Sequence, residues 1–463
     1  MNSKILYPIL FFVLCFSCIP EKESKQSLRL QISENHRFLE TENGEPFFWL
    51  GDTGWLLFKK LNREEAETYF DDRKQKGFNV IQAMLIHDLK NPVNVYGDSA
   101  FLNKNVAYPL VIKGNSFENP DEYDYWDHVE YLIDLANQKG LYMGLVPIWG
   151  SNVRAGGVTQ KQAEKYAYWL AERFKDKTNV IWLNGGDVRG SDSTNIWKTI
   201  GNTLKKNNSD QLVTFHPFGR TQSFTWFHNE EWLDFNMFQS GHRRYDQDTT
   251  GLCYGEDNYR YVESDYNKIP VKPTLDGEPS YEGIPQGLHD FSQPRWTASD
   301  VRRYAYWSVF AGGCGFTYGN NAIMQFHRVG DEDASYGVEE TWQKALSAPG
   351  ASQMKYLKNI MLSRPYFERV PFPEFVSGIQ GEKYSYLAAT KGQGYVYVYL
   401  YCGQTISLDL NKLPFRQAKV SWYDPRTGDT INAGNFAANK TVEFDPPGKE
   451  GAGNDWVLVF DRI

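Results

Sequence analysis

Residues Leu275 to Glu282 read LDGEPSYE and follow directly on a short extended segment, Lys272 to Leu275. Glycine and proline on either side of Glu278 indicate a tight turn that presents this carboxylate at the end of a strand. Earlier in the chain, the apolar run 179–183 ends in NGGD, which places Asp187 in a similar setting. Both places predict a buried strand that is followed at once by an acidic side chain.

Short apolar segments of this kind recur through the first three quarters of the chain, and helical patterns or long loops separate them. Apolar strands without polar alternation are typical of a parallel sheet that is covered on both faces. The predicted strands are 47–50, 78–85, 141–148, 179–183, 212–215, 233–238, 272–275 and 315–318. Eight such repeats predict an α/β fold, a (β/α)8 TIM barrel over residues 31–365.

Several of the predicted helices begin with a recognisable capping residue. Asn62 is followed by Glu65 in a capping box, and Thr159, Ser193 and Thr297 stand at the start of later helical patterns. Residues 31–42 are predicted to form a strand or two ahead of the barrel.

The pattern changes near residue 370, where alternating strands and short turns replace the helices. Because no helical pattern intervenes, residues 366–463 are predicted to form a small antiparallel β-sandwich. Its role is either packing against the barrel or binding carbohydrate, since a fold alone does not establish function. The predicted strands are 383–389, 394–401, 405–410, 419–423, 440–444 and 455–460.

The N-terminus carries a basic residue, Lys4, and an apolar stretch that is too short to span a bilayer. Residues 1–17 therefore predict a secretory signal peptide of the lipoprotein type, with Cys18 as the lipidated residue. Residues 18–30 are predicted to form a polar tether. Export and a lipid anchor in the outer membrane follow from this interpretation, and the anchor would be the only membrane contact. A signal that is simply cleaved would still predict export.

Composition narrows the class of protein. The 463 residues are 41% hydrophobic and 23% charged, as in a globular protein, and the net charge of −8 argues against nucleic acid as a partner. Aromatic residues reach 16%, and their faces suit sugar rings as well as a protein core. Cys253, Cys314 and Cys402 are widely spaced and indicate neither a disulfide framework nor a zinc site. We expect no cofactor and no metal.

The active site of a TIM barrel lies at the C-terminal ends of its strands. Asp187 follows the fourth predicted strand and Glu278 the seventh, so the barrel would bring the two carboxylates together. Such a pair suits hydrolysis of a glycosidic bond, with Glu278 as nucleophile and Asp187 as general acid and then base. Either residue could instead form a structural ion pair. Asp276, two residues before Glu278, is the competing carboxylate.

Other polar and aromatic residues fall at the same strand ends and are candidates for substrate binding. Aspartate and histidine could bond to sugar hydroxyls, and the aromatic rings could stack on the sugar. Each of them could also be a turn residue, a structural histidine or part of the core. They are Asp52, Trp55, His87, Trp149, His216, Gln239, His242 and Tyr318. The long loops 90–124 and 221–231 are expected to shape the substrate pocket.

Separate motifs along the chain resemble those of one known family. FFWLGDTGW (47–55), FNVIQAML (78–85), NGGD (184–187) and DGEPSYE (276–282) are similar to the apiosidase-like glycoside hydrolases. WYDPRTG (422–428) and WVLVF (456–460) resemble the sandwich domain that follows in that family, which is labelled collagen-binding. The resemblance implies removal of apiose-linked side chains from the plant pectin rhamnogalacturonan II by a Bacteroidetes organism. It also implies Asp187 as acid/base and Glu278 as nucleophile. In the wider superfamily the fourth strand ends in Asn-Glu, whereas here it ends in Asn-Gly-Gly-Asp.

Other functions stay open at this point. The barrel could act on another plant polysaccharide, or it could be a non-catalytic glycan-binding surface lipoprotein. A metal-dependent hydrolase would use His87, His216 and His242 with Asp52, although the chain has no HExxH motif.

Overall fold

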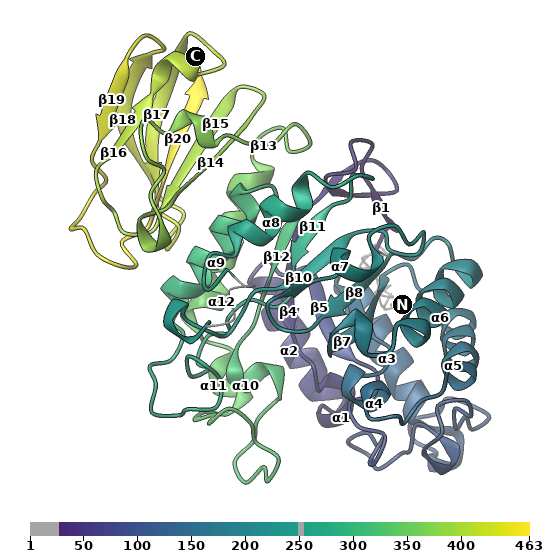
Figure 1. The fold of residues 1–463 in the computed structure, drawn as a ribbon. Helices are drawn as coiled ribbons and strands as arrows, with labels where there is room; N and C mark the ends of the chain where they lie inside the picture. Colours follow the sequence, from purple (N-terminus) through teal and green to yellow (C-terminus); the bar gives the residue numbers. More distant parts are fainter. Residues whose placement is uncertain (1–26, 249–253) are drawn as a thin grey trace, which may run out of the picture.

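The computed structural model describes residues 27–248 and 254–463. The predicted signal peptide, Cys18 and most of the predicted tether lie outside the described residues. Within the described ranges, none of the helices is long and apolar enough to cross a lipid bilayer. Figure 1 shows a larger unit of strands and helices and a smaller, all-β unit that contains the C-terminus.

The larger unit is a barrel of eight parallel strands, as predicted. Neighbouring strands pair in the order β8-β7-β6-β5-β4-β12-β11-β10. The ring is nearly closed between β8 and β10, where the backbone N–H of Asp234, two residues before β10, donates to the carbonyl of Val213 at 2.9 Å. A short ninth strand, β9 (Thr221–Gln222), pairs antiparallel with β10. The barrel strands are β4 (Trp49–Thr53), β5 (Val80–Met84), β6 (Tyr142–Val146), β7 (Val180–Val188), β8 (Val213–Pro217), β10 (Asn236–Gln239), β11 (Thr274–Asp276) and β12 (Gly315–Tyr318).

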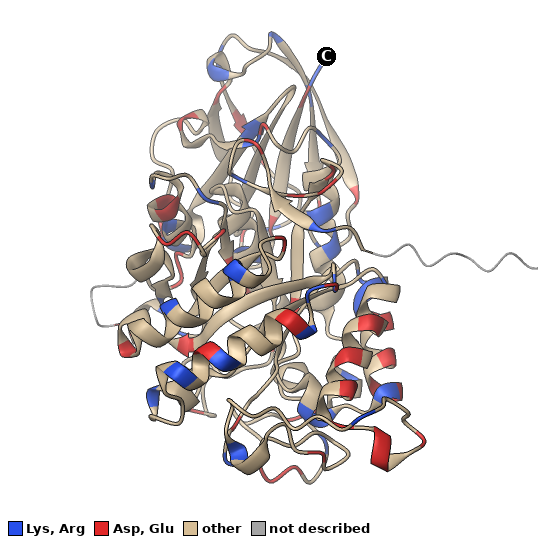
Figure 2. Ribbon diagram, turned by 90° about the vertical axis from the view of Figure 1, so that its right-hand side faces the viewer, with Lys and Arg blue, Asp and Glu red and all other residues tan. Residues whose placement is uncertain are grey.

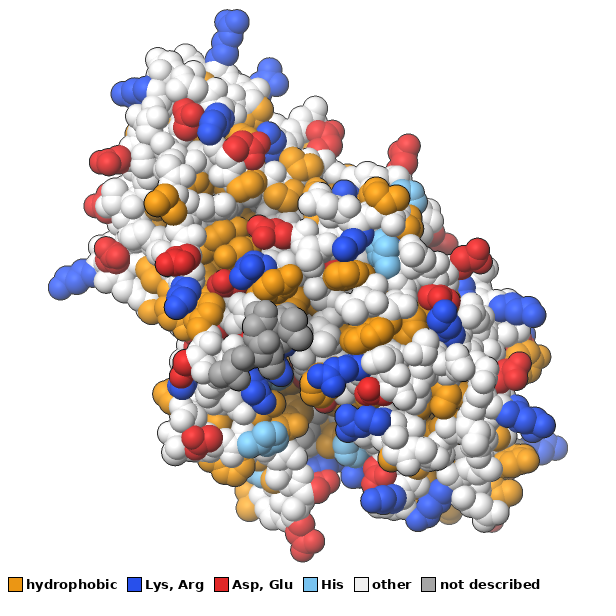
Figure 3. Space-filling view, viewed as in Figure 1, with side chains coloured by type: hydrophobic (Ala, Val, Ile, Leu, Met, Phe, Trp, Pro, Cys, Tyr) orange, Lys and Arg blue, Asp and Glu red, His pale blue; other side chains and the backbone are white. Residues whose placement is uncertain are grey.

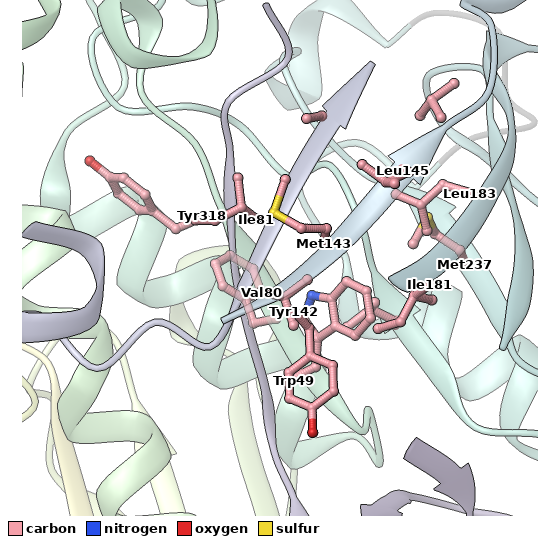
Figure 4. Packing of buried hydrophobic residues seen from close by; sticks show 14 of the residues in the cluster. Trp49, Val80, Ile81, Tyr142, Met143, Leu145, Ile181, Leu183, Met237 and Tyr318 are labelled. Carbon is pink, nitrogen blue, oxygen red and sulfur yellow. The ribbon is translucent and has the colours of Figure 1, made fainter. Parts of the chain in front are cut away.

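The barrel is a packed core, not a pore. Every residue of β5 and β6 is buried, which agrees with strands that are covered on both faces. Figure 4 shows side chains from different strands, among them Ile81, Met143 and Leu183, packed in one cluster. Charged residues lie mainly on the helices and loops in Figure 2, and the barrel strands are nearly free of them.

Helices surround the barrel, and their starts follow local capping chemistry. Asn62, Thr159 and Thr297 accept hydrogen bonds from the backbone of the first turn, as predicted. Ser193 precedes its helix but makes no such bond, and its hydroxyl donates to the carbonyl of Asp192. The longer helices are α2 (Arg63–Gln75), α3 (Tyr125–Gln138), α5 (Gln160–Arg173), α6 (Thr194–Asn207), α8 (Tyr259–Tyr266), α9 (Ala298–Phe310) and α12 (Pro349–Leu362).

A small antiparallel sheet precedes the barrel. It consists of β1 (Leu30–Ile32), β2 (Leu39–Thr41) and β3 (Pro46–Phe47). The ring of Phe47 lies 5.0 Å from that of Tyr142 at the start of β6. This sheet therefore packs at the end of the barrel opposite to the strand ends where the candidate site residues lie.

The C-terminal unit is the predicted β-sandwich. A six-stranded sheet, β13-β14-β15-β20-β17-β18, faces a two-stranded sheet, β16-β19, and all pairings are antiparallel. Two strands, β13 and β18, were not predicted: β13 has only two residues, and the sequence of β18, TINAGNFA, mixes polar and apolar residues on both faces because it is a largely exposed edge strand. The strands are β13 (Val370–Pro371), β14 (Leu387–Gly392), β15 (Tyr395–Leu400), β16 (Ile406–Asp409), β17 (Gln417–Tyr423), β18 (Thr430–Ala437), β19 (Thr441–Phe444) and β20 (Trp456–Arg462).

The sandwich is firmly attached to the barrel. In β15 the valines enter the sandwich core, whereas the alternate tyrosines belong to the hydrophobic cluster of the barrel. Tyr399 stacks on Tyr306 of α9 with ring centroids 4.7 Å apart. The buried guanidinium of Arg302 donates to both oxygens of Asp455 at 2.9 and 2.7 Å. Removing one partner of such a buried pair typically costs about 3–5 kcal/mol.

Candidate active site

A cavity of about 370 Å³ opens at the C-terminal ends of the barrel strands. Asp187 and Glu278 both line it. Figure 3 shows a hollow low on the face in view, bordered by histidine and by basic side chains. The structure therefore brings the two carboxylates to one cavity, as the sequence predicted.

The turn that carries Glu278 is held by backbone hydrogen bonds. β11 ends at Asp276, and the next carbonyl, of Gly277, accepts from Nε2 of Gln82 at 2.9 Å. The carbonyl of Glu278 accepts from the N–H groups of Ser240 and Gly241, both at 3.1 Å. These hydrogen bonds fix the backbone of Glu278 independently of its side-chain contacts.

The carboxylate of Glu278 is buried and meets two histidines. His242 Nε2 donates to Oε1 at 3.2 Å, and His216 Nε2 lies 3.1 Å from Oε2. Burial acts to raise the pKa of Glu278, but the contacts with these two histidines outweigh it and lower the pKa to about 2. Glu278 is thus ionised at neutral pH. The Tyr281 hydroxyl accepts from Trp55 Nε1 at 3.1 Å, and burial and then the negative charge of Glu278 raise the pKa of Tyr281.

Asp187 reaches the cavity through an irregularity in β7. The register of β7 against β8 shifts between Gly185 and Val188. Gly185, Gly186 and Asp187 have φ values of 95°, 98° and 51°, a region that glycine adopts readily. A Cβ on Gly186 would lie 2.7 Å from the ring of Trp149. The two glycines therefore form a bulge, which explains why the acid here follows Asn184 by three residues.

The environment of Asp187 favours the protonated acid. Burial and then the negative charge of Glu278 raise the pKa of Asp187 to about 7. Its backbone N–H donates to His216 Nδ1 at 3.3 Å, so this nitrogen is the acceptor and Nε2 carries the proton. The pKa of Asp187 is thus above that of an ordinary carboxyl group, and the pKa of Glu278 is below it. This difference suits Asp187 as an acid and Glu278 as a nucleophile.

Most of the residues predicted to bind substrate lie at this cavity. Trp55, His87, Trp149, Gln239 and His242 line it. His216 is fully buried against Glu278 and the two tryptophans, so it supports the site. Burial and the nearby charge of Lys59 lower the pKa of His87. Contact of these residues with a sugar stays a prediction.

Two of the predicted substrate contacts lie elsewhere. Asp52 is fully buried, accepts from the Tyr69 hydroxyl at 2.7 Å and pairs with Arg73 at 3.4 Å. The hydroxyl of Tyr318 donates to Glu282 at 2.6 Å, away from the cavity. Both were expected to face substrate because they lie at the ends of barrel strands. Asp52 instead points toward Tyr69 and Arg73 of α2, and Tyr318 points toward Glu282 after β11. Neither residue lines the cavity.

The competing carboxylate is also structural. Asp276 is fully buried and accepts from Ser240 Oγ at 2.6 Å and from Asn258 Nδ2 at 2.9 Å. Burial raises its pKa to about 7. Asp276 does not line the cavity.

The prediction missed the loops that complete the cavity. Loops 90–124 and 221–231 were expected to shape it, but neither contributes a lining residue. The loops after β8, β10, β11 and β12 do so instead. Tyr281 lies within the quoted motif DGEPSYE, three residues after Glu278, and that spacing was the available signal. The other missed lining residues include Arg220, Arg243, Leu288, His289, Gln325 and Tyr336.

Within residues 27–248 and 254–463, no group of three or more His, Cys, Asp or Glu side chains is arranged to hold a metal ion. The set considered for a metal-dependent hydrolase is not brought together. Asp52 pairs with Arg73, whereas His216 and His242 face Glu278.

Two solved structures are similar to this chain over nearly its whole length. One, described as "Glycoside hydrolase", is 45% identical, with a TM-score of 0.87, and the match covers 94% of this chain and 97% of that one. The other, a glycoside hydrolase family 5 protein from Bacteroides vulgatus, is 43% identical with a TM-score of 0.87, covering 95% of each chain. A third protein from Bacteroides vulgatus shares the fold at 15% identity and a TM-score of 0.64, covering 95% of this chain and 83% of that one. None of the curated proteins matches the chain.

Two family models match, one for each unit of the fold. Residues 33–368 match "Apiosidase-like, catalytic domain" and residues 370–461 match "Putative collagen-binding domain of a collagenase". The catalytic model covers the whole barrel and contains both candidate carboxylates. The chain is therefore a member of the apiosidase-like family of glycoside hydrolases.

Proposed function

We propose that this protein is a retaining glycosidase in which Glu278 is the nucleophile and Asp187 the acid and base. The observation that carries the proposal is that the pKa values of two carboxyl groups in one cavity are shifted in opposite directions. Contacts with two histidines favour the ionised form of Glu278, whereas burial and the charge of Glu278 raise the pKa of Asp187 to about 7, so that Asp187 keeps its proton below neutral pH. This is the division of labour that the reaction needs.

In the first step, a carboxylate oxygen of Glu278 attacks the anomeric carbon and forms a covalent glycosyl ester. The bond from that carbon to the leaving oxygen breaks, and Asp187 donates its proton to this oxygen. In the second step, Asp187 is a carboxylate and takes a proton from water. That water attacks the anomeric carbon, the ester bond breaks, and Glu278 regains its negative charge.

The two proposed catalytic residues lie close to each other. A single imidazole, that of His216, connects them: Nδ1 lies 3.3 Å from the backbone nitrogen of Asp187 and Nε2 lies 3.1 Å from Glu278 Oε2. The charge of Glu278 also acts directly on the pKa of Asp187. The retaining mechanism that we propose predicts a separation of about 5–5.5 Å between the two carboxyl groups, whereas an inverting enzyme would leave about 6.5–9.5 Å for water.

The proposed substrates are apiose-linked side chains of the pectin rhamnogalacturonan II. Support for this sugar comes from the apiosidase-like model, which matches the entire barrel. The cavity has aromatic walls formed by Trp55 and Trp149 beside polar groups, an arrangement that suits a sugar with apolar and hydroxyl-bearing faces. Export and a lipid anchor on Cys18 would place the enzyme where plant oligosaccharides are met.

Two measurements test the proposal. The enzyme is incubated with rhamnogalacturonan II oligosaccharides and with other pectic oligosaccharides, and the released sugars are identified by chromatography. Apiose is the expected product; another sugar as the main product would refute the substrate. In the presence of methanol, a retaining enzyme gives the methyl glycoside with the anomeric configuration of the substrate, and the inverted glycoside would refute the mechanism.

A further inference from the structure

The segment from Ser240 to Asn258 connects β10 with α8. The first and the last residue of this segment both bond to β11, the strand that precedes Glu278. Ser240 Oγ and Asn258 Nδ2 contact the same oxygen of Asp276, Oδ2, at 2.6 and 2.9 Å. Asp276 is the last residue of β11 and stands two residues before Glu278. The described ends of this segment therefore fix the backbone from which the nucleophile projects.

The start of the segment also holds Glu278 itself. The N–H groups of Ser240 and Gly241 donate to its carbonyl, and His242 donates to its carboxylate. His242 has a φ of 115°, a conformation that an L-residue adopts only when its surroundings impose it. The carbonyl of His242 accepts from Gly287 at 2.7 Å, which ties it to the loop after β11.

The end of the segment is held by the C-terminal domain. The hydroxyl of Tyr384 contacts both oxygens of Glu256, at 2.9 and 3.1 Å. Glu256 is fully buried and pairs with Arg303 of α9 at 2.6 Å. Arg303 lies 4.7 Å from the ring of Tyr384 and 5.2 Å from that of Tyr401, so the two domains jointly enclose this buried ion pair.

The same domain contacts the segment at a second place. The ring of Tyr245 lies 5.7 Å from that of Tyr384, and the ammonium group of Lys383 lies 5.3 Å from the Tyr245 ring. The hydroxyl of Tyr245 bonds in turn to Asp257, next to Glu256. Residues near both ends of the segment thus contact the turn that precedes β14 of the sandwich.

We propose that the C-terminal domain positions the nucleophile, and that Tyr384 is the positioning residue through which it acts. Tyr384 bonds to Glu256, which stands two residues before Asn258. Ser240 and Asn258 bond to Asp276, and His242 bonds to the carboxylate of Glu278. The inference rests on the assignment of Glu278 as nucleophile. It gives the sandwich a role in turnover that requires no ligand of its own.

The test compares two full-length variants that each lose one tyrosine hydroxyl of the sandwich. Tyr384→Phe removes the bonds to Glu256. Tyr395→Phe is the matched control, because this tyrosine lies in β15 of the same domain and its hydroxyl donates to the carbonyl of Pro365 at 3.2 Å, away from the segment. For Tyr384→Phe we expect kcat to fall about 5- to 10-fold with KM little changed, which is the scale of one lost hydrogen bond. Amide hydrogen exchange should become faster at residues 240–242 and 276–282.

The control should keep the wild-type kcat and the wild-type exchange rates at these residues, whatever its effect on the melting temperature. Equal kcat and exchange for wild type and Tyr384→Phe would overturn the inference. A failure of the proposed function looks different, because Glu278→Gln would then keep its turnover. Hydrogen exchange needs no substrate, so it tests the positioning role even if the sugar is not apiose.

Discussion

The backbone N–H of Asp187 donates to Nδ1 of His216 at 3.3 Å. This bond leaves the other ring nitrogen of His216 as the one that carries a proton, and that nitrogen points to Glu278. The bulge that turns Asp187 into the cavity therefore also sets the tautomer of the histidine beside the nucleophile. The acid and the nucleophile are built as one unit, not as two independent strand ends.

Replacing Glu278 with glutamine should lower kcat by about 10⁴-fold or more, because an amide cannot act as the nucleophile. The matched control is Glu282→Gln. Glu282 lies in the same turn region, is equally buried and has a pKa raised by burial, but it bonds to Tyr318 and to the N–H of Gly350. A neutral amide keeps an acceptor there, so the control should stay within about tenfold of wild type. Comparable turnover by Glu278→Gln and wild type would end the assignment.

Replacing Asp187 with alanine should slow substrates with poor leaving groups far more than activated aryl glycosides, since only the former need a proton on the leaving oxygen. Asp333→Ala is the control. Asp333 also lines the cavity, but it is paired with Lys59 and Lys60 and is half exposed. Its loss should affect both kinds of substrate alike. Equal losses for both kinds with Asp187→Ala would argue against an acid role.

The pH profile of kcat/KM should fall as pH rises through about 7, where Asp187 loses its proton. The acid limb should lie low, because His242 and His216 lower the pKa of Glu278. Removing the donor in His242→Leu disfavours the ionised form, so the acid limb should move to higher pH. His289→Leu is the control, since His289 lines the same cavity and packs beside Tyr336. An acid limb that stays in place in His242→Leu would contradict this account.

Features that depend on nearby residues were predictable from the sequence, and features that depend on distant partners were not. The caps at Asn62, Thr159 and Thr297 need only the first turn of their own helix. The barrel strands are apolar because both faces are covered, so their pattern is visible in the chain. The inward turn of Asp52 depends instead on Arg73 and Tyr69, which reach it only once α2 packs on β4.

The same distinction applies within the site. The motifs NGGD and DGEPSYE identified both carboxylates, since each follows a strand. The bulge at Gly186 depends on the ring of Trp149 from the preceding strand end, and the histidine pair depends on β8 and on the loop after β10. These contacts join residues far apart in the chain, so no local pattern contains them. Tyr281 was within reach, because it belongs to the motif itself.

Replacing Cys18 with alanine should release the exported protein from the membrane fraction, because the thiol is the proposed site of lipidation. The measurement is immunoblotting of membrane and soluble fractions from the native host. Cys402→Ala serves as the control, since this half-buried cysteine lies in the sandwich and should not affect anchoring. Unchanged membrane retention of Cys18→Ala would refute the lipid anchor and leave only export.

Replacing Asp187 with asparagine should stabilise the fold at alkaline pH while it abolishes the acid function. The pKa of Asp187 is raised from 3.8 to about 7 on folding. The unfolded chain therefore loses this proton first, and the free energy of unfolding falls as pH rises between these values. Each unit of pKa corresponds to about 1.4 kcal/mol, so the cost above neutral pH is at most about 4 kcal/mol. Asparagine does not ionise, so the Asp187→Asn variant avoids this loss of stability.

Thermal unfolding of wild type and Asp187→Asn at about pH 5 and about pH 8 tests this, since the gain should be larger at the higher pH. Asp333→Asn should show the opposite sign, because the salt bridges from Lys59 and Lys60 favour the charged form of Asp333 and its neutralisation removes them. A gain from Asp187→Asn that is equal at both pH values would mean that packing, and not ionisation, is the cause. A loss at the higher pH would contradict the raised pKa itself, and with it the protonated acid that the mechanism requires.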